Sequence, residues 1–197
     1  ISMTRTREFD PNEVLEKAIP VFWEHGFSDT SIDDLVGATG VSRYGLYDAF
    51  GSKRGLFEAA LDRYASEIGR ELQGSLLNDD ASLGDIEAYF ERLIAMIEGS
   101  AVGRLGCMIG ATGAELGPTD EAMAGRVRAH LASARKSMEN ALRNAEIKGL
   151  LKEGMDPEAG AAFLVTVLQG ASVLTRSKCK AGGIASSLRL ALSAVRK

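Results

Sequence analysis

The sequence predicts an all-α protein of about nine helices, with a small three-helix unit at its N-terminus and a larger helical body after it. Three observations support this. Apolar residues recur at spacings of three and four along most of the chain, and Val/Ile/Thr-rich alternating runs are missing. Only four prolines interrupt 197 residues, of which 45% are hydrophobic. We expect the first unit to span residues 3–51 and the body residues 52–197.

The first helix is predicted to begin at Pro11, with Asp10 as its cap, and to end near Gly26. Pro20 lies inside this helix and is expected to kink it. Before the helix, residues 4–9 form a short basic arm. The apolar stripe of the first helix consists of Val14, Leu15, Ala18, Ile19 and Phe22.

Residues 30–53 predict two short helices joined by a tight turn. The first is capped by Ser31 and ends at Gly40, and the second is capped by Ser42 with Leu46 and Phe50 facing inward. This leaves four positions facing outward: Arg43, Tyr44, Gly45 and Tyr47. A guanidinium and two phenols near a helix N-terminus suit base edges and phosphates in a major groove. The alternative is a helical hairpin with an ordinary polar surface.

Residues 22–35 (FWEHGFSDTSIDDL) and 40–57 (GVSRYGLYDAFGSKRGLF) resemble the DNA-binding domain of the TetR family. The resemblance implies that residues 42–50 form the recognition helix, that Tyr47 contacts phosphate, and that Lys53 contacts the DNA backbone. Gly45 departs from the family pattern, which favours Ser, Thr or Ala there, and removes a possible contact. The pair Asp48-Ala49 also departs from it. The predicted DNA-binding residues are Arg5, Arg7, Thr30, Ser31, Ser42, Arg43, Tyr44, Tyr47 and Lys53.

The charge of the first unit argues against DNA binding. Residues 1–56 hold six Lys/Arg and nine Asp/Glu, a net charge of −3, whereas DNA-binding domains are usually basic. The prediction therefore requires the basic side chains to gather on one face.

In the body, capping residues and periodicity predict helices over residues 52–77, 82–99, 106–117 and 118–149, and from Asp156-Pro157 onward. Gly182-Gly183 is predicted to separate the last helix, from Ile184 to Val195. The glycines of residues 106–117 fit no phosphate-binding motif, so we expect close helix packing there. The last two helices are apolar nearly all round, which favours a symmetric partner. The resemblance likewise implies dimerisation through them.

The resemblance also implies a ligand pocket in the body. Cys107 lies just before a predicted helix, and in this it resembles a thiol that senses electrophiles in one branch of the family. The commoner role of a free cysteine is that of a small buried side chain. No spacing typical of metal ligands is present, and we expect no cofactor. The predicted ligand-binding residues are Tyr64, Phe90, Ile94, Ile97, Cys107, Met108, Met123, Val127, His130, Phe163 and Val167.

Taken together, the residues and the resemblance predict a cytoplasmic, homodimeric repressor that binds a palindromic double-stranded DNA operator and is released by a small-molecule effector. No signal peptide and no run of about 18 apolar residues is recognised, so no membrane association is expected. One alternative is an enzyme, but the sequence shows no nucleophile–base pair, metal cluster or phosphate loop. Another is a helical ligand-binding or thiol-sensing module whose DNA binding is weak or lost.

Overall fold

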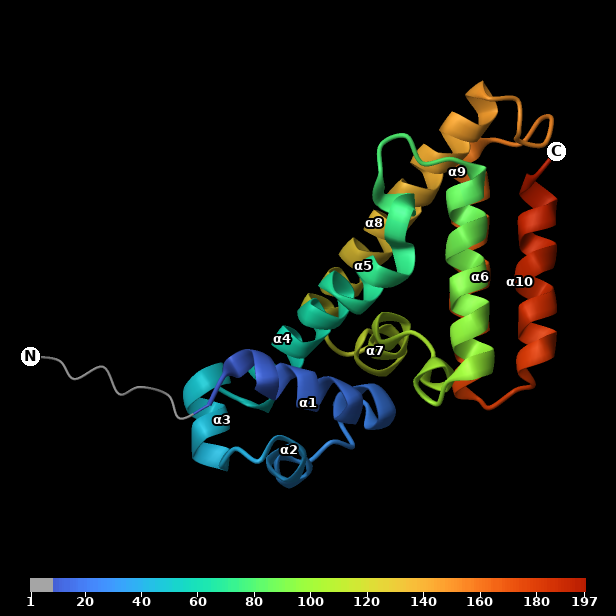
Figure 1. Ribbon diagram of the computed structural model, residues 1–197. Helices are drawn as coiled ribbons and strands as arrows, with labels where there is room; N and C mark the ends of the chain where they lie inside the picture. The colour runs from blue at the N-terminus through green and yellow to red at the C-terminus, as the bar shows by residue number, and fades with distance from the viewer. Residues whose placement is uncertain (1–8) are drawn as a thin grey trace, which may run out of the picture. The chain divides into compact units, whose positions relative to one another are not determined.

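The computed structural model describes residues 9–197, which group into two compact units, residues 9–66 and Glu67–Lys197. We call these units the head and the body. The predicted all-α fold is confirmed. The described elements of the head are α1 (Pro11–His25), α2 (Ile32–Thr39), α3 (Arg43–Phe50) and α4 (Lys53–Ser66). Those of the body are α5 (Ile68–Gln73), the 3-10 segments η1 (Gly74–Leu77) and η2 (Val102–Leu105), α6 (Leu83–Gly99), α7 (Met108–Leu116), α8 (Glu121–Ile147), α9 (Pro157–Arg176) and α10 (Ala181–Val195) (Figure 1).

The core of the head forms where α1 packs against α4. Phe22 and Phe57 meet edge to face with ring centroids 5.0 Å apart, and Trp23 meets Tyr64 in the same way at 4.8 Å. Asp10 caps α1 as predicted, since its Oδ1 accepts from the N–H of Asn12 at 2.8 Å. These apolar contacts supply the stability that α2 and α3, eight residues each, cannot generate alone.

The turn between α2 and α3 follows the sequence prediction closely. Ser31 Oγ accepts from the N–H of Asp34 while the Asp34 carboxylate accepts from the N–H of Ser31, which makes a reciprocal capping box. Gly40 ends α2 with φ +73°, a left-handed conformation that favours glycine. Ser42 Oγ then accepts from the N–H of Gly45 at 3.2 Å and caps α3.

The single helix predicted over residues 52–77 is interrupted, which raises the number of α-helices in the described range from nine to ten. Ser66 Oγ donates to the carbonyl of Arg63 near the interruption, and such bonds compete with the helical ladder. Farther along, Arg92 of α6 donates to the carbonyls of Leu72 and Gln73, both at 2.9 Å. These bonds hold the end of α5, and Gly74 turns the chain at φ +53°. The hydrophobic periodicity of the sequence does not predict these hydrogen bonds of Arg92.

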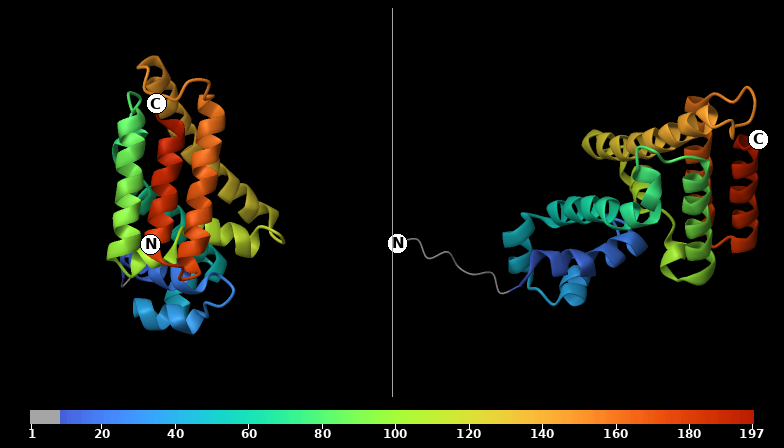
Figure 2. Two further views of the ribbon diagram at one scale, coloured as in Figure 1. Left: turned by 90° about the vertical axis from the view of Figure 1, so that its right-hand side faces the viewer. Right: turned by 45° about the horizontal axis from the view of Figure 1, so that its top comes forward.

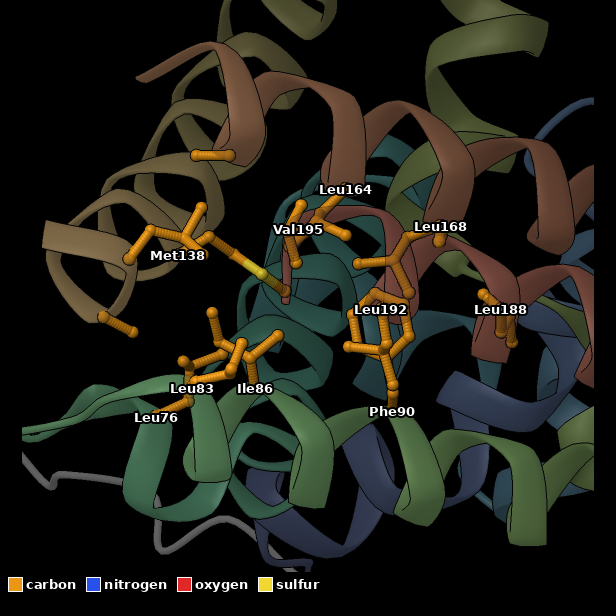
Figure 3. Packing of buried hydrophobic residues seen from close by; sticks show 14 of the residues in the cluster. Leu76, Leu83, Ile86, Phe90, Met138, Leu164, Leu168, Leu188, Leu192 and Val195 are labelled. Atoms are coloured by element: carbon orange, nitrogen blue, oxygen red, sulfur yellow. The ribbon is translucent and has the colours of Figure 1, made fainter. Parts of the chain in front are cut away.

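The body is built around α6, α9 and α10, with α10 lying between the other two (Figure 2). Phe90 of α6 lies among Leu168, Leu188 and Leu192 (Figure 3). Met138 reaches into the same cluster from α8. Two ion pairs join α10 to α6 at the surface: Arg189 with Glu91 at 3.0 Å, and Arg196 with Glu87 at 3.1 Å.

Two predicted boundaries in the body are shifted. Helix α8 starts at Glu121 rather than Pro118, because the Asp120 side chain accepts from the N–H of Met123 and sets the cap there. Helix α10 begins at Ala181, so Gly182 and Gly183 lie inside its first turn instead of separating it from α9. The chain instead reverses at Lys178, three residues before α10 begins, where φ is +59°.

Helices α9 and α10 leave part of their apolar surface uncovered, as the sequence predicted. The exposed large side chains are Phe163, Val173 and Leu174 on α9 and Leu190 on α10. Helix α9 is long and apolar enough to cross a membrane, with a mean hydropathy of 1.3 over an 18-residue window. Core helices of soluble proteins share these properties, and α9 buries Ala161, Leu164 and Leu168 in the body.

Candidate nucleic-acid interface

Helix α3 presents a cluster of polar side chains because only one of its residues is fully buried. Leu46 is anchored in the core of the head, whereas Arg43, Tyr44 and Tyr47 are exposed, as predicted. Tyr44 is the most open of the three at 72% exposure. The short helix therefore offers a guanidinium and two phenol groups from residues 43–47.

Gly45 does not face outward, and that prediction was wrong. A Cβ atom at this position would lie 2.8 Å from Val41 Cγ1 and 3.1 Å from Phe9 Cε1. Glycine is thus favoured at this position, because a larger residue would force the side chains of Val41 and Phe9 to shift. Its presence does not remove a contact from the exposed face, because the missing side chain would point into the head.

Arg43 is held by an acidic neighbour. Its Nη2 donates to Asp33 Oδ1 of α2 at 2.8 Å, and both side chains are exposed. This hydrogen bond and the charge of Asp33 raise the pKa of the Arg43 guanidinium above its ordinary value. The pair fixes the direction of the guanidinium but contributes little to stability, because solvent screens an ion pair that is exposed on both sides.

Lys53, the first residue of α4, is directed into the head. Its ammonium donates to the carbonyl of Phe27 at 2.8 Å and to the carbonyl of Thr30 at 2.7 Å. The same nitrogen lies 4.4 Å from the centroid of the Phe27 ring. Lys53 therefore joins α4 to the α1–α2 connection, a contact that the sequence analysis missed because the partners lie 23 and 26 residues away.

Thr30 has to be removed from the predicted DNA-binding set. Its side chain is 1% exposed, and its hydroxyl donates to the carbonyl of Gly26 at 2.6 Å. Ser31 is exposed, and its hydroxyl donates to Asp34 within the capping box. Ser42 is also exposed and caps α3. Arg5 and Arg7 lie outside the described residues.

The predicted ligand-binding residues of the body do not form one group. Phe90, Ile94 and Ile97 belong to its hydrophobic core. Phe163 is 42% exposed on the outer side of α9, so it does not line an interior pocket of the single chain, contrary to the prediction. Tyr64 belongs to the head, where it packs on Trp23. The remaining residues are buried (Met108, Met123, Val127) or half-buried (Cys107, His130, Val167).

Around α7, helices pack closely at small residues, as expected for residues 106–117. A Cβ at Gly110 would lie 2.3 Å from Gln169 Oε1, and one at Gly113 would lie 3.0 Å from Val127 Cγ1. Half-buried Cys107 caps α7, accepting from the N–H of Gly110 at 3.5 Å, and its own N–H donates to Ser172 Oγ at 2.6 Å. Tyr89 belongs to this region, and burial raises the pKa of its phenol, with a smaller contribution from Cys107. Sequence reasoning did not point to Gln169 or Ser172 because α9 reads only as an apolar helix.

Among residues 9–197, no group of three His, Cys, Asp or Glu side chains is placed to hold a metal ion. The arrangement of the head offers hydrogen-bond donors and a cation on an exposed helix. It is suited to recognition of a polyanion rather than to bond-breaking chemistry.

Comparisons with known proteins match both units. Residues 14–60 match the family model described as bacterial regulatory proteins, tetR family, and residues 82–185 match the model of the tetracyclin repressor-like C-terminal domain. The HTH-type transcriptional repressor ComR of Escherichia coli is 30% identical over 175 residues, 89% of this chain and 83% of ComR. The repressor DhaR of a Mycobacterium species is 26% identical, over 80% of this chain and 78% of DhaR.

Among solved structures, a cysteine mutant of the TetR family regulator CifR in complex with 26-bp operator DNA is 29% identical to this chain. The TM-score is 0.81, and the match covers 96% of this chain and 99% of CifR. With both family models matched and a relative aligned over most of its length, the chain belongs to the TetR family of ligand-responsive, DNA-binding transcriptional repressors, which act as dimers and are not enzymes.

Proposed function

We propose that α3 enters the major groove of a palindromic operator, with Arg43 and Tyr44 reaching base edges and Tyr47 donating to a phosphate. The observation that carries this proposal is the exposure of these three side chains on a helix fixed by Leu46 and the Ser42 cap. An arginine donates in bidentate fashion to guanine O6 and N7, and a phenol suits a phosphate oxygen. Ser31 and Ser42 lie at the helix N-termini beside this surface, and the basic arm with Arg5 and Arg7 precedes it.

The Asp33–Arg43 pair gives the acidic head a role in selectivity. On DNA without the right bases, Arg43 keeps its carboxylate partner, and Asp33 repels the phosphates. A guanine at the right place competes for the guanidinium. The acidic balance of the head therefore disfavours non-specific binding, which depends mainly on phosphate neutralisation.

The homodimer we propose forms through α9 and α10, whose exposed apolar side chains Phe163, Val173, Leu174 and Leu190 lie outside the core of the single chain. In such a dimer the two recognition helices would enter successive major grooves about 34–36 Å apart. A small-molecule effector bound by the body would release DNA only if it binds more tightly to the form in which that spacing is lost. We place this function in the cytoplasm.

The test begins with selection of bound fragments from random and genomic DNA, which defines the operator. Operator affinity is then measured for Arg43→Ala and for the control Arg128→Ala, which removes an exposed arginine from α8 in the body. We expect Arg43→Ala to weaken operator binding by about 1–3 kcal/mol, roughly 5- to 150-fold, and to relax preference at one base position. The control should match the wild type. Unchanged affinity of Arg43→Ala, or no enriched palindrome, would contradict the assignment.

A further inference from the structure

Helix α2 opens with two neighbouring carboxylates that have different partners. Asp34 Oδ2 accepts from the backbone N–H and the hydroxyl of Ser31, at 2.8 and 2.6 Å, and so completes the capping box. Asp33 takes no part in this cap. Its side chain is 80% exposed, and its Oδ1 accepts from Arg43 Nη2 of α3 at 2.8 Å. Asp33 is therefore available for a role other than starting the helix.

The Asp33–Arg43 pair leaves hydrogen-bonding groups available on both side chains. A guanidinium has five N–H donors, and an ionised carboxylate has two acceptor oxygens. Among residues 9–197, Arg43 donates to Asp33 alone, and Asp33 Oδ2 accepts no hydrogen bond. Because the pair uses one N–H and one oxygen, an edge of the guanidinium with two donors remains beside a carboxylate that can still accept.

The caps of the two helices fix where these side chains begin. Asp33 is the second residue of α2 and lies within the capping box of Ser31 and Asp34. Arg43 is the first residue of α3 and follows the cap Ser42 directly. The hydrogen bond between the two side chains then fixes them relative to one another. The exposed edge of the pair therefore presents two donors followed by an acceptor.

This order of groups complements one base pair in the major groove. Guanine presents N7 and O6 as acceptors, and its paired cytosine presents N4–H as a donor. When an arginine donates to N7 and O6, the nitrogen at O6 is the one nearer to the cytosine. A carboxylate bonded to that nitrogen lies beside the cytosine N4–H. Guanine therefore competes only for the donors that Asp33 does not hold, and the pair stays together.

We propose that Asp33 is a specificity-determining residue, which accepts a hydrogen bond from the N4–H of the cytosine paired with the guanine that Arg43 reads. The inference rests on the proposed function, because it requires α3 to bring Arg43 to that guanine. It adds a direct base contact from α2 to the repulsion of phosphates by Asp33. An A·T pair presents an acceptor, a donor and an acceptor in that order, so it does not match the Asp33–Arg43 pair.

The experiment measures the affinity of the full chain for the selected operator and for two modified duplexes. The guanine is identified as the position at which Arg43→Ala relaxes base preference. In one duplex, N4-methylcytosine replaces the cytosine paired with this guanine, which keeps the base pair and puts a methyl group in place of the major-groove donor. In the other duplex, 7-deazaguanine replaces the guanine and removes its N7 acceptor.

The variant is Asp33→Ala, which removes both acceptor oxygens. The matched control is Asp29→Ala, which removes an exposed carboxylate from the connection between α1 and α2. Fluorescence of Trp23, buried in the head, establishes that each variant is folded at the temperature used. Each protein is compared with itself on modified and unmodified DNA, so changes in stability or in repulsion of phosphates cancel.

For the wild type and for Asp29→Ala, we expect N4-methylation to lower operator affinity at least about fivefold, because a hydrogen bond to a charged acceptor is lost. Asp33→Ala should bind the methylated and the unmodified operator with affinities within about twofold of each other. The 7-deazaguanine duplex should bind all three proteins more weakly, since each of them retains Arg43.

An equal loss on the methylated operator for the wild type and Asp33→Ala would overturn the inference, because the methyl group would then meet another part of the protein. Unchanged wild-type affinity for the methylated operator, with binding still weakened by 7-deazaguanine, would also overturn it and would leave the proposed role of Arg43 intact. If 7-deazaguanine does not weaken wild-type binding, Arg43 does not read this guanine, and the proposed function fails together with the inference.

Discussion

The substitution Gly45→Ala tests how the recognition helix is packed, because local and tertiary effects predict opposite results. Alanine stabilises a helix by about 1 kcal/mol relative to glycine. The new Cβ, however, would lie 2.8 Å from Val41 Cγ1 and 3.1 Å from Phe9 Cε1. Forcing a methyl group into a packed site costs about 1–3 kcal/mol. We therefore expect the free energy of unfolding of the head to fall by about 1 kcal/mol.

Gly37 provides a matched control. It lies in α2, with nothing within 4 Å of a Cβ built on it, so only helix propensity applies. Gly37→Ala should stabilise the head by about 0.5–1 kcal/mol. The two exchanges are chemically identical, and they differ only in what surrounds the added methyl group.

Urea unfolding followed by Trp23 fluorescence measures both variants. Trp23 is the single tryptophan of the chain and packs on Tyr64 inside the head, so its signal reports the unit that is changed. With an m-value of about 1–2 kcal/mol/M, the midpoint should fall by about 0.5–1 M for Gly45→Ala and rise by a similar amount for Gly37→Ala. Equal stabilisation by both variants would show that Gly45 does not meet Val41 and Phe9 as described.

Two further predictions concern pH and assembly. Hydrogen bonds from the Ser31 hydroxyl and backbone N–H lower the pKa of Asp34 below its ordinary value of 3.8. The ionised Asp34 carboxylate therefore stabilises the folded head fully above that value. This contribution is lost as the pH falls through the lower pKa that Asp34 has in the folded state. In acid titrations followed by Trp23, Asp34→Asn should lose less stability below about pH 4 than the wild type, and a response identical to that of Asp29→Asn would count against the capping box. Leu190 is 70% exposed on α10, and Leu190→Asp should give a folded monomer in sedimentation experiments. Ile147→Asp, at an apolar position 83% exposed on α8, should remain dimeric, and a dimer in both cases would refute the α9–α10 interface.

The helices and their caps could be predicted from the sequence because the interactions that set them span three or four residues. Ser31 with Asp34, Ser42 with Gly45, and Asp10 with Asn12 each form within one turn. The uncovered apolar surface of α9 was predictable for a related reason, since a helix that is apolar all round needs cover on more than one side.

The site residues were predicted well only where exposure follows from helical spacing alone. Arg43, Tyr44 and Tyr47 fall outside the apolar i, i+4 positions Leu46 and Phe50 of an eight-residue helix, and periodicity therefore predicts their exposure. Thr30 was assigned to the surface because its type and position suit a phosphate, but the turn after Gly26 directs its hydroxyl inward. Phe163 was assigned to an interior pocket, yet the packing of α9 leaves it on the outside.

The sequence by itself determined the fold class, the helix-turn-helix, the exposed recognition residues and the need for a partner along the last two helices. The tertiary structure decided which contacts those residues make: the approach of Phe9 to Gly45, the Asp33–Arg43 pair, and the hydrogen bonds of Lys53 to the Phe27 and Thr30 carbonyls. The reason is physical. Helix formation depends on neighbours within one turn. A side chain meets partners that lie 10 to 36 residues away only where packed helices cross, so these contacts depend on the crossing angles.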